Sequence, residues 1–362
     1  MEIIRDTKNT AFEGCDFVVK AESGKQIRLL QLTDMQLINS EQRRTPDRLR
    51  ADEINAWLPD NFDDLCGDHI RSLVAQTKPD MIFITGDITY GSFDDTGATL
   101  KWICELMDSF EIPWAPVFGN HDNESEKGVK WQCEQFEKSQ YCLFNRGNVS
   151  GNGNYTVGLA VGNDLVRVIH MIDSNGCSHS DDPSVVRRRG IYPDQMDLIR
   201  SNTDKIRMAQ DKSVKAFMAF HIPVDCFTEA EMNKGYLTDE RINYTIGVSV
   251  PAFDDDFGCK YEDCRKGTID TGEGFIDFLK ECNVDGVFVG HCHNINTCIR
   301  YSGIRWVYGL KTGQYDYHNV GQVGGTLITL FDHDFSVSHI PSLVICGRYP
   351  AQAPMLNRLF VK

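Results

Sequence analysis

Three short apolar runs separated by two helical patterns constrain the fold of the first third of this chain. The runs cover residues 26–32, 80–85 and 114–117, and each one stops at a glycine or a polar residue. Runs of this length with such boundaries indicate buried strands. Apolar residues recur at helical spacing over residues 60–76 and 100–107. Strands that alternate with helices pair in parallel through right-handed crossovers, so we expect a parallel sheet here.

Polar side chains follow these three runs and two later ones, over residues 214–220 and 284–289. They are Asp34, Asp87, Asn120, His221 and the pair His291 and His293. In open α/β sheets, ligands bind at the carboxyl ends of the strands, so all five motifs can meet there. Carboxylate, amide oxygen and neutral imidazole suit Mn, Fe, Zn or Mg-like ions. Two such ions about 3.5–4 Å apart can share one carboxylate and bind a phosphoryl group between them.

The stretch from Phe118 to Asp122 is the centre of this pattern. Asn120 offers a neutral oxygen to a hard cation, and His121 can transfer a proton near neutral pH. Asp122 can orient that imidazole. Taken alone, the stretch fits a polar loop with a helix cap equally well, and the four other strand ends favour a functional site.

The last third of the chain alternates between apolar and polar residues. The runs 297–301, 304–308, 325–331 and 336–340 are typical of antiparallel strands. We therefore predict one domain over residues 1–362, built from two sheets packed face to face with helices outside. Residues 224–270 lack a clear period, which is typical of a cap or insertion near a site.

Composition excludes several classes of protein. The chain has 362 residues, of which 41% are hydrophobic and 25% charged, as in ordinary soluble globular proteins. It contains no stretch of about 18 apolar residues, so we expect no membrane span. A net charge of −15 disfavours nucleic-acid binding, which needs clustered Lys and Arg.

The cysteines and the first residues bear on the compartment. The odd number of cysteines, 13, favours buried thiols in a reducing compartment over a disulfide framework. A zinc site at Cys259 and Cys264 has only weak support, because no second pair follows. The charged start of the chain lacks the apolar region of a signal peptide, so we predict a cytoplasmic location.

The order and spacing of the five motifs resemble the calcineurin-like metallophosphoesterases. That family's pattern is D-x-H, G-D, G-N-H-[DE], a lone His after a strand, and G-H-x-H. The corresponding segments here are Asp34-Met35-Gln36, Gly86-Asp87, Gly119-Asn120-His121-Asp122, His221 and Gly290-His291-Cys292-His293. Residues 308–313 with Tyr317-His318 are similar to the intracellular purple-acid-phosphatase-like branch. The resemblance spans residues 26–331 and implies a four-layer α/β/β/α sandwich that hydrolyses phosphate esters.

The resemblance also implies a role for each matching residue. Asp87 bridges two divalent or mixed-valence ions (Mn, Fe, Zn or Mg), and a metal-bridging hydroxide is the nucleophile. Asp34 and His293 hold the first ion, whereas the second is held by Asn120, His221 and His291. His121 is not a ligand. It stabilises the phosphoryl charge or protonates the leaving oxygen, with Asp122 as its partner.

The same resemblance places Tyr317 and His318 beside the substrate, a phosphorylated small molecule or phosphoprotein. The triplet Arg187–Arg189 could bind a substrate phosphate, but an exposed loop is the simpler interpretation. His170, inside a strand pattern, is interpreted as a core or sheet-face histidine.

Gln36 stands where the family has a metal-binding histidine. Tyr90 offers a rescue, because Gly86-Asp87-Ile88-Thr89-Tyr90 has the spacing that purple acid phosphatases use to bind Fe(III). Otherwise Tyr90 is an ordinary aromatic at a strand end and the first site is loose. The alternative function is a catalytically weak relative that acts as a binding or regulatory protein, although the retained His121 counts against it. Cys292 should point away from the metals in an extended segment.

Overall fold

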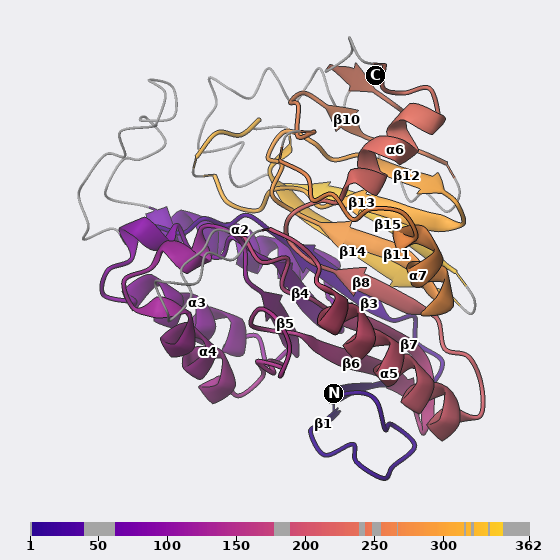
Figure 1. The fold of residues 1–362 in the computed structure, drawn as a ribbon. Helices are drawn as coiled ribbons and strands as arrows, with labels where there is room; N and C mark the ends of the chain where they lie inside the picture. Colours follow the sequence, from indigo (N-terminus) through magenta and orange to yellow (C-terminus); the bar gives the residue numbers. More distant parts are fainter. Residues whose placement is uncertain are drawn as a thin grey trace.

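A computed structural model describes residues 2–39, 62–176, 189–238, 243–247, 255–265, 267–314, 316–319, 322–331 and 334–342. Their strands form a five-stranded sheet, an eight-stranded sheet and a two-stranded ribbon (Figure 1). The prediction of two mixed sheets with flanking helices is confirmed.

The five-stranded sheet has the order β15-β14-β3-β4-β5. Its strands are β3 (Arg28–Leu32), β4 (Met81–Thr85), β5 (Trp114–Val117), β14 (Gly324–Leu330) and β15 (Phe335–Pro341). The strands β3, β4 and β5 are parallel, as the strand–helix alternation predicted. Strand β14 pairs antiparallel with both β15 and β3, so the end of the chain completes a sheet begun near its start.

The eight-stranded sheet has the order β1-β2-β6-β7-β8-β11-β13-β12. Its first five strands in the chain are β1 (Glu2–Ile4), β2 (Phe17–Ala21), β6 (Tyr155–Val161), β7 (Asp164–Met171) and β8 (Ala216–Ala219). The others are β11 (Val284–Val289), β12 (Cys298–Tyr301) and β13 (Ile304–Tyr308). Strand β8 lies between β7 and β11 and is parallel to both, so the ends of β8 and β11 lie side by side.

Helices cover the outer faces of both sheets (Figure 1). On the side of the five-stranded sheet they are α2 (Phe62–Thr77), α3 (Ala98–Asp108) and α4 (Gly128–Lys138). On the side of the eight-stranded sheet they are α5 (Pro193–Gln210), α6 (Asp225–Asn233) and α7 (Phe275–Glu281). Single 3-10 turns occur as η2 (Gly91–Phe93) and η3 (Asp122–Glu124). The molecule is therefore layered as helices, sheet, sheet and helices.

Aromatic side chains hold the two sheets together. Phe83 of β4 packs edge-on against Phe288 of β11, with ring centroids 5.6 Å apart. Phe217 of β8 packs against Phe335 of β15 at 4.7 Å. All four side chains are buried, and burying an aromatic ring of this size contributes roughly 1.5–3 kcal/mol. The apolar residues of the strands thus form the layer between the sheets, and their carboxyl ends open at one edge.

The segment 224–270 was predicted to cap the site. Its described part contains α6 and the ribbon of β9 (Tyr244–Thr245) and β10 (Cys259–Lys260), which pattern analysis missed. A fully buried ion pair joins the two, with Lys260 Nζ 2.6 Å from Glu231 Oε2. Gly267 reaches the neighbourhood of His291, so this segment does border the strand ends. Positions 239–242, 248–254 and 266 lie outside the described residues.

Two smaller predictions can also be compared with the structure. His170 of β7 is buried and hydrogen-bonds Thr156 Oγ1 at 3.0 Å, which confirms its interpretation as a core histidine. No helix in the described part of the chain is long and apolar enough to cross a bilayer.

Candidate metal centre

The strand ends bring three predicted ligands together. Asp34 follows β3, Asp87 follows β4 and His221 follows β8, and one potential ligand atom from each lies within 4.8 Å of the other two. All three side chains are almost fully buried. His221 Nε2 is 3.3 Å from Asp87 Oδ2. Residues from both sheets therefore meet at one point, as the strand-end pattern predicted.

The other three predicted ligands surround this group. Asn120 Oδ1 is 3.2 Å from His221 Nε2, and His293 Nε2 is 3.4 Å from Asp34 Oδ1. The rings of His221 and His291 lie 5.2 Å apart. The backbone N–H of His291 also donates to Asp34 Oδ2 at 2.9 Å. All six predicted core ligands thus form one cluster.

The backbone is strained where the ligands leave their strands. Asp34, Asp87 and His291 have φ values of 50°, 50° and 72°, which side chains other than glycine rarely adopt. Such strain persists only where the surrounding structure holds it, and it concentrates at functional sites. A side chain on Gly119 would place its Cβ 2.1 Å from Asp87 Oδ1, which explains the glycine before Asn120.

Backbone carbonyls orient two of the imidazoles. His221 Nδ1 donates to the carbonyl of Thr85 at 2.8 Å, and His293 Nδ1 donates to that of Tyr317 at the same distance. Each bond keeps a proton on Nδ1, so Nε2 is the ring atom that faces the carboxylates and that would bind a metal after losing its own proton. This is the usual arrangement around histidines that bind metals.

The charges of the cluster shift the ionisation of its members. Burial favours the neutral form of Asp87, but His221 and His121 outweigh it and hold the pKa of Asp87 well below its usual value. Burial alone would lower the pKa of His221, whereas the charges of Asp87 and Asp34 raise it to about 9. The carboxylates therefore hold positive charge close to them.

The residues fit a divalent metal. The structure contains buried carboxylates, an amide oxygen and imidazole nitrogens close to one another, which is the donor set of Mn, Fe or Zn ions. A metal would replace the proton on His221 as the partner of Asp87. The fit is closest for Asp34, Asp87 and His221, and the other three predicted ligands lie beside them.

Gln36 lies inside the cluster, and its side-chain amide is hydrogen-bonded to Lys311 and Asp87. Its side chain is buried, and its Oε1 accepts a hydrogen bond from Lys311 Nζ at 2.8 Å. Its Nε2 donates to Asp87 Oδ2 at 3.4 Å. Lys311 is also buried and donates to the backbone carbonyl of Asp34 at 2.8 Å. Sequence reasoning assigned no role to this lysine.

The predicted pairing of Asp122 with the His121 imidazole is wrong. Asp122 Oδ1 accepts the N–H of Thr89 at 2.8 Å and Oδ2 accepts that of Gly119 at 2.7 Å. The His121 ring instead has Nδ1 3.0 Å from Glu124 Oε2. The reason is the 3-10 turn η3, which directs Asp122 into the core and brings Glu124, three residues on, beside His121. The H-x-x-E spacing was the signal for this pair.

Tyr90, Tyr317 and His318 all lie near the cluster. The buried ring of Tyr90 stacks on His121, with centroids 4.4 Å apart. Tyr317 stacks on His293 at 4.2 Å, besides accepting its Nδ1 hydrogen through the backbone. His318 is half-buried and its Nδ1 donates to the carbonyl of Asp316 at 3.0 Å. Tyr317 therefore orients a predicted ligand, a role that the sequence did not indicate.

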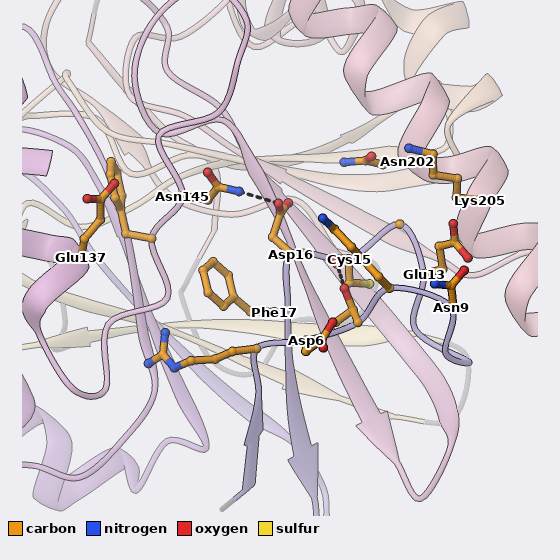
Figure 2. A pocket seen from close by; sticks show the side chains of 15 residues that line it. Asp6, Asn9, Glu13, Cys15, Asp16, Phe17, Glu137, Asn145, Asn202 and Lys205 are labelled. Atoms are coloured by element: carbon orange, nitrogen blue, oxygen red, sulfur yellow. Dashed lines mark hydrogen bonds between the residues drawn. The ribbon is translucent and has the colours of Figure 1, made fainter. Parts of the chain in front are cut away.

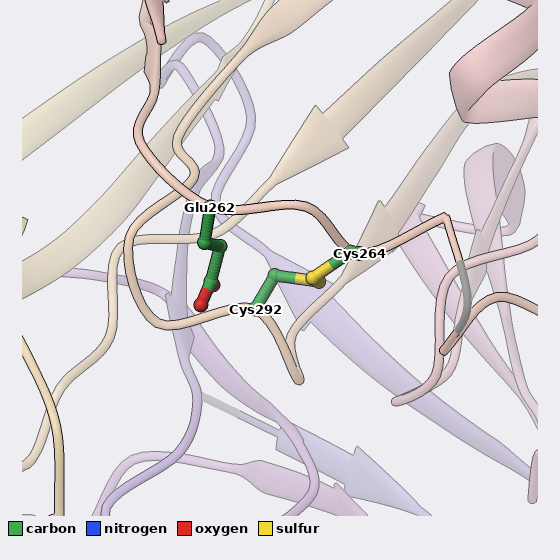
Figure 3. A group of neighbouring side chains, drawn as sticks. All are labelled: Glu262, Cys264 and Cys292. Carbon is green, nitrogen blue, oxygen red and sulfur yellow. A yellow bond between two sulfur atoms is a disulfide. The ribbon is translucent and has the colours of Figure 1, made fainter. Parts of the chain in front are cut away.

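A disulfide joins Cys292, between the two histidines, to Cys264 (Figure 3). The expectation of thiols is wrong for this pair, while nine other described cysteines are buried and form no disulfide. The proposed pairing of Cys259 with Cys264 around zinc is also excluded, because Cys264 is bonded to Cys292. The bond ties the ligand loop to the segment that borders it, and Glu262 of that segment accepts the N–H of Asn294 at 3.0 Å.

Arg189 is the only described member of the arginine triplet, since positions 187 and 188 lie outside the described residues. It is exposed, and its Nη1 donates to the carbonyl of Gly267 at 3.2 Å. Its charge contributes to the lowered pKa of His291, after burial and His221. One arginine of the triplet therefore stands at the border of the cluster.

A separate cavity of about 590 Å³ opens near the N-terminus (Figure 2). Its carboxylate Asp16 is engaged by Asn145 Nδ2 and the N–H of Thr156. Burial, helped by Asp16, raises the pKa of the Cys15 thiol far above its usual value, which keeps it protonated and unreactive. Its lining contains carboxylates but no histidine, unlike the cluster at the strand ends.

The fold and the cluster together point to the family of metal-dependent phosphoesterases. The chain belongs to the calcineurin-like phosphoesterase family, whose model matches residues 27–294. Probable inactive purple acid phosphatase 28 of Arabidopsis thaliana is 26% identical over 285 residues, covering 70% of this chain and 62% of that protein. Phosphatase DCR2 of Saccharomyces cerevisiae is 26% identical over 250 residues, covering 64% of this chain and 39% of the yeast protein.

Thus the chain spans 62% and 39% of the lengths of these two relatives. Among solved structures, purple acid phosphatase PPD1 from yellow lupin aligns with a TM-score of 0.45 at 13% identity, covering 89% of this chain and 55% of that chain.

Proposed function

We propose that this protein is a metal-dependent phosphoesterase that hydrolyses a phosphate ester at the strand-end cluster. The observation that carries the proposal is the convergence of Asp34, Asp87 and His221, whose ligand atoms lie within 4.8 Å of one another. Membership in the calcineurin-like phosphoesterase family supports the same reaction. The name of the yeast relative, a phosphatase, agrees with it.

The protein's own residues would hold and orient the reacting groups. Asp87 would lie between two metal positions, with Asp34 and His293 on one side. Asn120, His221 and His291 would form the other side. When bound, the metal ions polarise the phosphoryl oxygens and lower the pKa of the attacking water. The buried carboxylates supply the negative charge that retains these ions.

His121 would transfer the proton to the leaving oxygen or stabilise the phosphoryl charge. Glu124 Oε2 lies 3.0 Å from Nδ1, so this pair orients the imidazole for proton transfer. A carboxylate in this place keeps the imidazole in one orientation and stabilises its charged form. The His121 side chain is 12% exposed, whereas His221 and Asp87 are at most 1% exposed, so substrate would approach from the His121 side.

The substrate would be a phosphorylated small molecule or phosphoprotein. Arg189 borders the cluster and carries a charge that attracts a phosphate, and Tyr317 and His318 would contact the remainder of the substrate. One domain over residues 1–362, a cytoplasmic location and the absence of nucleic-acid or membrane partners remain predictions. The Cys264–Cys292 disulfide argues against a reducing compartment and the nine cysteines that form no disulfide argue for one.

A catalytically weak binding or regulatory protein is the second candidate. Gln36 in place of the family's histidine favours it, and one relative carries the name probable inactive purple acid phosphatase 28. The His121–Glu124 pair favours the enzyme, because a binding protein has no need of an oriented proton donor. Turnover of a simple substrate separates the two.

The test is hydrolysis of p-nitrophenyl phosphate by the purified protein supplied with Mn²⁺ or Fe. We expect turnover that a chelator abolishes. Asp87→Asn should remove activity, whereas Asp204→Asn, on the exposed side of α5, should not. Retention of more than about a tenth of the turnover in Asp87→Asn, roughly 1.4 kcal/mol of barrier, would contradict the bridging role. A visible spectrum of the Fe-loaded sample tests Tyr90, since phenolate bound to Fe(III) colours a protein.

A further inference from the structure

The orientation of the Gln36 amide is fixed by its two neighbours. Lys311 carries only hydrogen-bond donors, so the atom that faces it must be the amide oxygen. The carboxylate of Asp87 only accepts, so the atom that faces it must be the NH₂ group. A flipped amide would set NH₂ against ammonium and oxygen against carboxylate. Gln36 therefore presents hydrogens, not a lone pair, to Asp87.

The surrounding structure leaves this amide little freedom. Its side chain and that of Lys311 are at most 1% exposed, and the Gln36 backbone N–H donates to the carbonyl of Asp87 at 2.8 Å. The backbone of Gln36 has a φ of 46°, which an ordinary side chain adopts only when its contacts hold it. Rotation of the amide oxygen toward a metal would break both hydrogen bonds of the pair.

Lys311 adds a fixed positive charge on the same side of the cluster. It comes from the chain that follows β13, and it also donates to the backbone carbonyl of Asp34. A divalent cation bound by Asp34 and His293 would meet this charge in a region of low dielectric, where repulsion is strong.

The other side of the cluster offers imidazole nitrogens and an amide oxygen where the first side has an amide NH₂ group. The Nε2 of His221 lies 3.2 Å from Asn120 Oδ1 and 3.3 Å from Asp87 Oδ2, and His291 lies against His221. These atoms can act as ligands once a metal replaces the proton of His221. The two halves of the cluster therefore differ in their available donors, and the cation beside each half differs too, since Lys311 is buried whereas Arg189 is exposed.

We propose that Gln36 and Lys311 hinder metal binding at the first position, so that the protein binds one metal ion tightly. Gln36 occupies the place of the missing ligand, and Lys311 supplies a positive charge that repels a cation there. The tightly bound ion is held by Asp87, Asn120, His221 and His291. The pair is a positioning unit, since Gln36 holds Asp87 and Lys311 holds Gln36. This inference concerns the site of the proposed function, but it is read from metal stoichiometry and not from turnover.

The test is Mn²⁺ titration of the metal-free protein by calorimetry, with the metal content measured after desalting. We expect one retained Mn²⁺ per wild-type chain. Lys311→Met removes the charge at similar size and should raise affinity for a second Mn²⁺ at least 10-fold. Lys138→Met, on the exposed face of α4, is the control for net charge and should change nothing.

A double-mutant cycle tests the pairing itself. Gln36→His alone should leave the second Mn²⁺ weak, because Lys311 remains, whereas Gln36→His with Lys311→Met should bind two ions tightly. If Lys311→Met fails to fold, Gln36→Glu decides, since its carboxylate neutralises Lys311 and offers an oxygen to the metal. Two tightly retained ions in the wild type would overturn the inference. An unchanged second affinity in both Lys311→Met and Gln36→Glu would do the same. Loss of turnover with one retained ion would contradict only the proposed function.

Discussion

Substitution of Asp122 by Asn should separate its structural role from the catalytic one that the sequence suggested. Both carboxylate oxygens accept buried backbone N–H groups, from Thr89 at 2.8 Å and Gly119 at 2.7 Å. Asparagine keeps one oxygen and turns an NH₂ group against the other donor. One hydrogen bond to a charged group is lost, at a cost of about 1.5–3 kcal/mol. We expect the free energy of unfolding to fall by that amount.

The assay is urea unfolding followed by far-UV circular dichroism. The measurement belongs at pH 8, where a carboxylate can accept hydrogen bonds from both backbone donors. With a slope of about 3 kcal/mol per M, the midpoint should move down by about 0.5–1 M urea. The expected loss of about 1.5–3 kcal/mol is a large part of the 5–15 kcal/mol that is usual for a folded domain.

Glu124→Gln is the matched comparison. Its side chain is 22% exposed and lies on the surface turn, so the free energy of unfolding should change by about 0.5 kcal/mol or less. Turnover should fall instead, since the carboxylate that orients His121 is gone. If Asp122→Asn left stability unchanged while Glu124→Gln left turnover unchanged, the assignment of these two carboxylates would be refuted.

Two further predictions concern histidines. His121→Ala should lower turnover by about 10²–10⁴ while the metal content stays constant, and a parallel loss of metal measured by atomic emission would make His121 a ligand. Burial lowers the pKa of His170 to about 4 from its ordinary 6.5, so the unfolded chain binds one more proton between these values. Stability should therefore rise with pH across that window, by up to about 1.4 kcal/mol per unit for this group. Urea unfolding of His170→Gln at pH 5 and 7 should show a smaller rise, and an equal rise would contradict the assignment.

The strands and the core ligands could be predicted because their signals are local. A short apolar run that stops at Asp34 or His221 identifies both a strand and the residue at its end, and parallel pairing brings these ends together. Helix α6 was missed because its apolar residues lack a regular period within the polar segment 224–270. Local periodicity carries no information about a short helix of this kind.

The neighbours of the ligands could not be predicted in the same way. Lys311 meets Gln36 across 275 positions of sequence, and a single buried lysine has no spacing pattern that reveals its partner. Cys264 and Cys292 are separated by 28 residues, and their pairing depends on how the segment folds over the ligand loop. Glu124, and not Asp122, lies beside His121 because of a 3-10 turn, and the direction of that turn follows from packing.

The pairing of β3 with β14 has a consequence for synthesis of the chain on the ribosome. Strand β3 lies within the first 32 residues, but its partner on one side ends at Leu330. At 5–20 residues per second, translation of the intervening chain takes on the order of half a minute. Through that time one edge of a β3–β4–β5 sheet would lack its partner, and such an edge is a template for pairing with other chains. The surroundings of Asp34 are therefore completed only after β14 has been synthesised and has covered this edge.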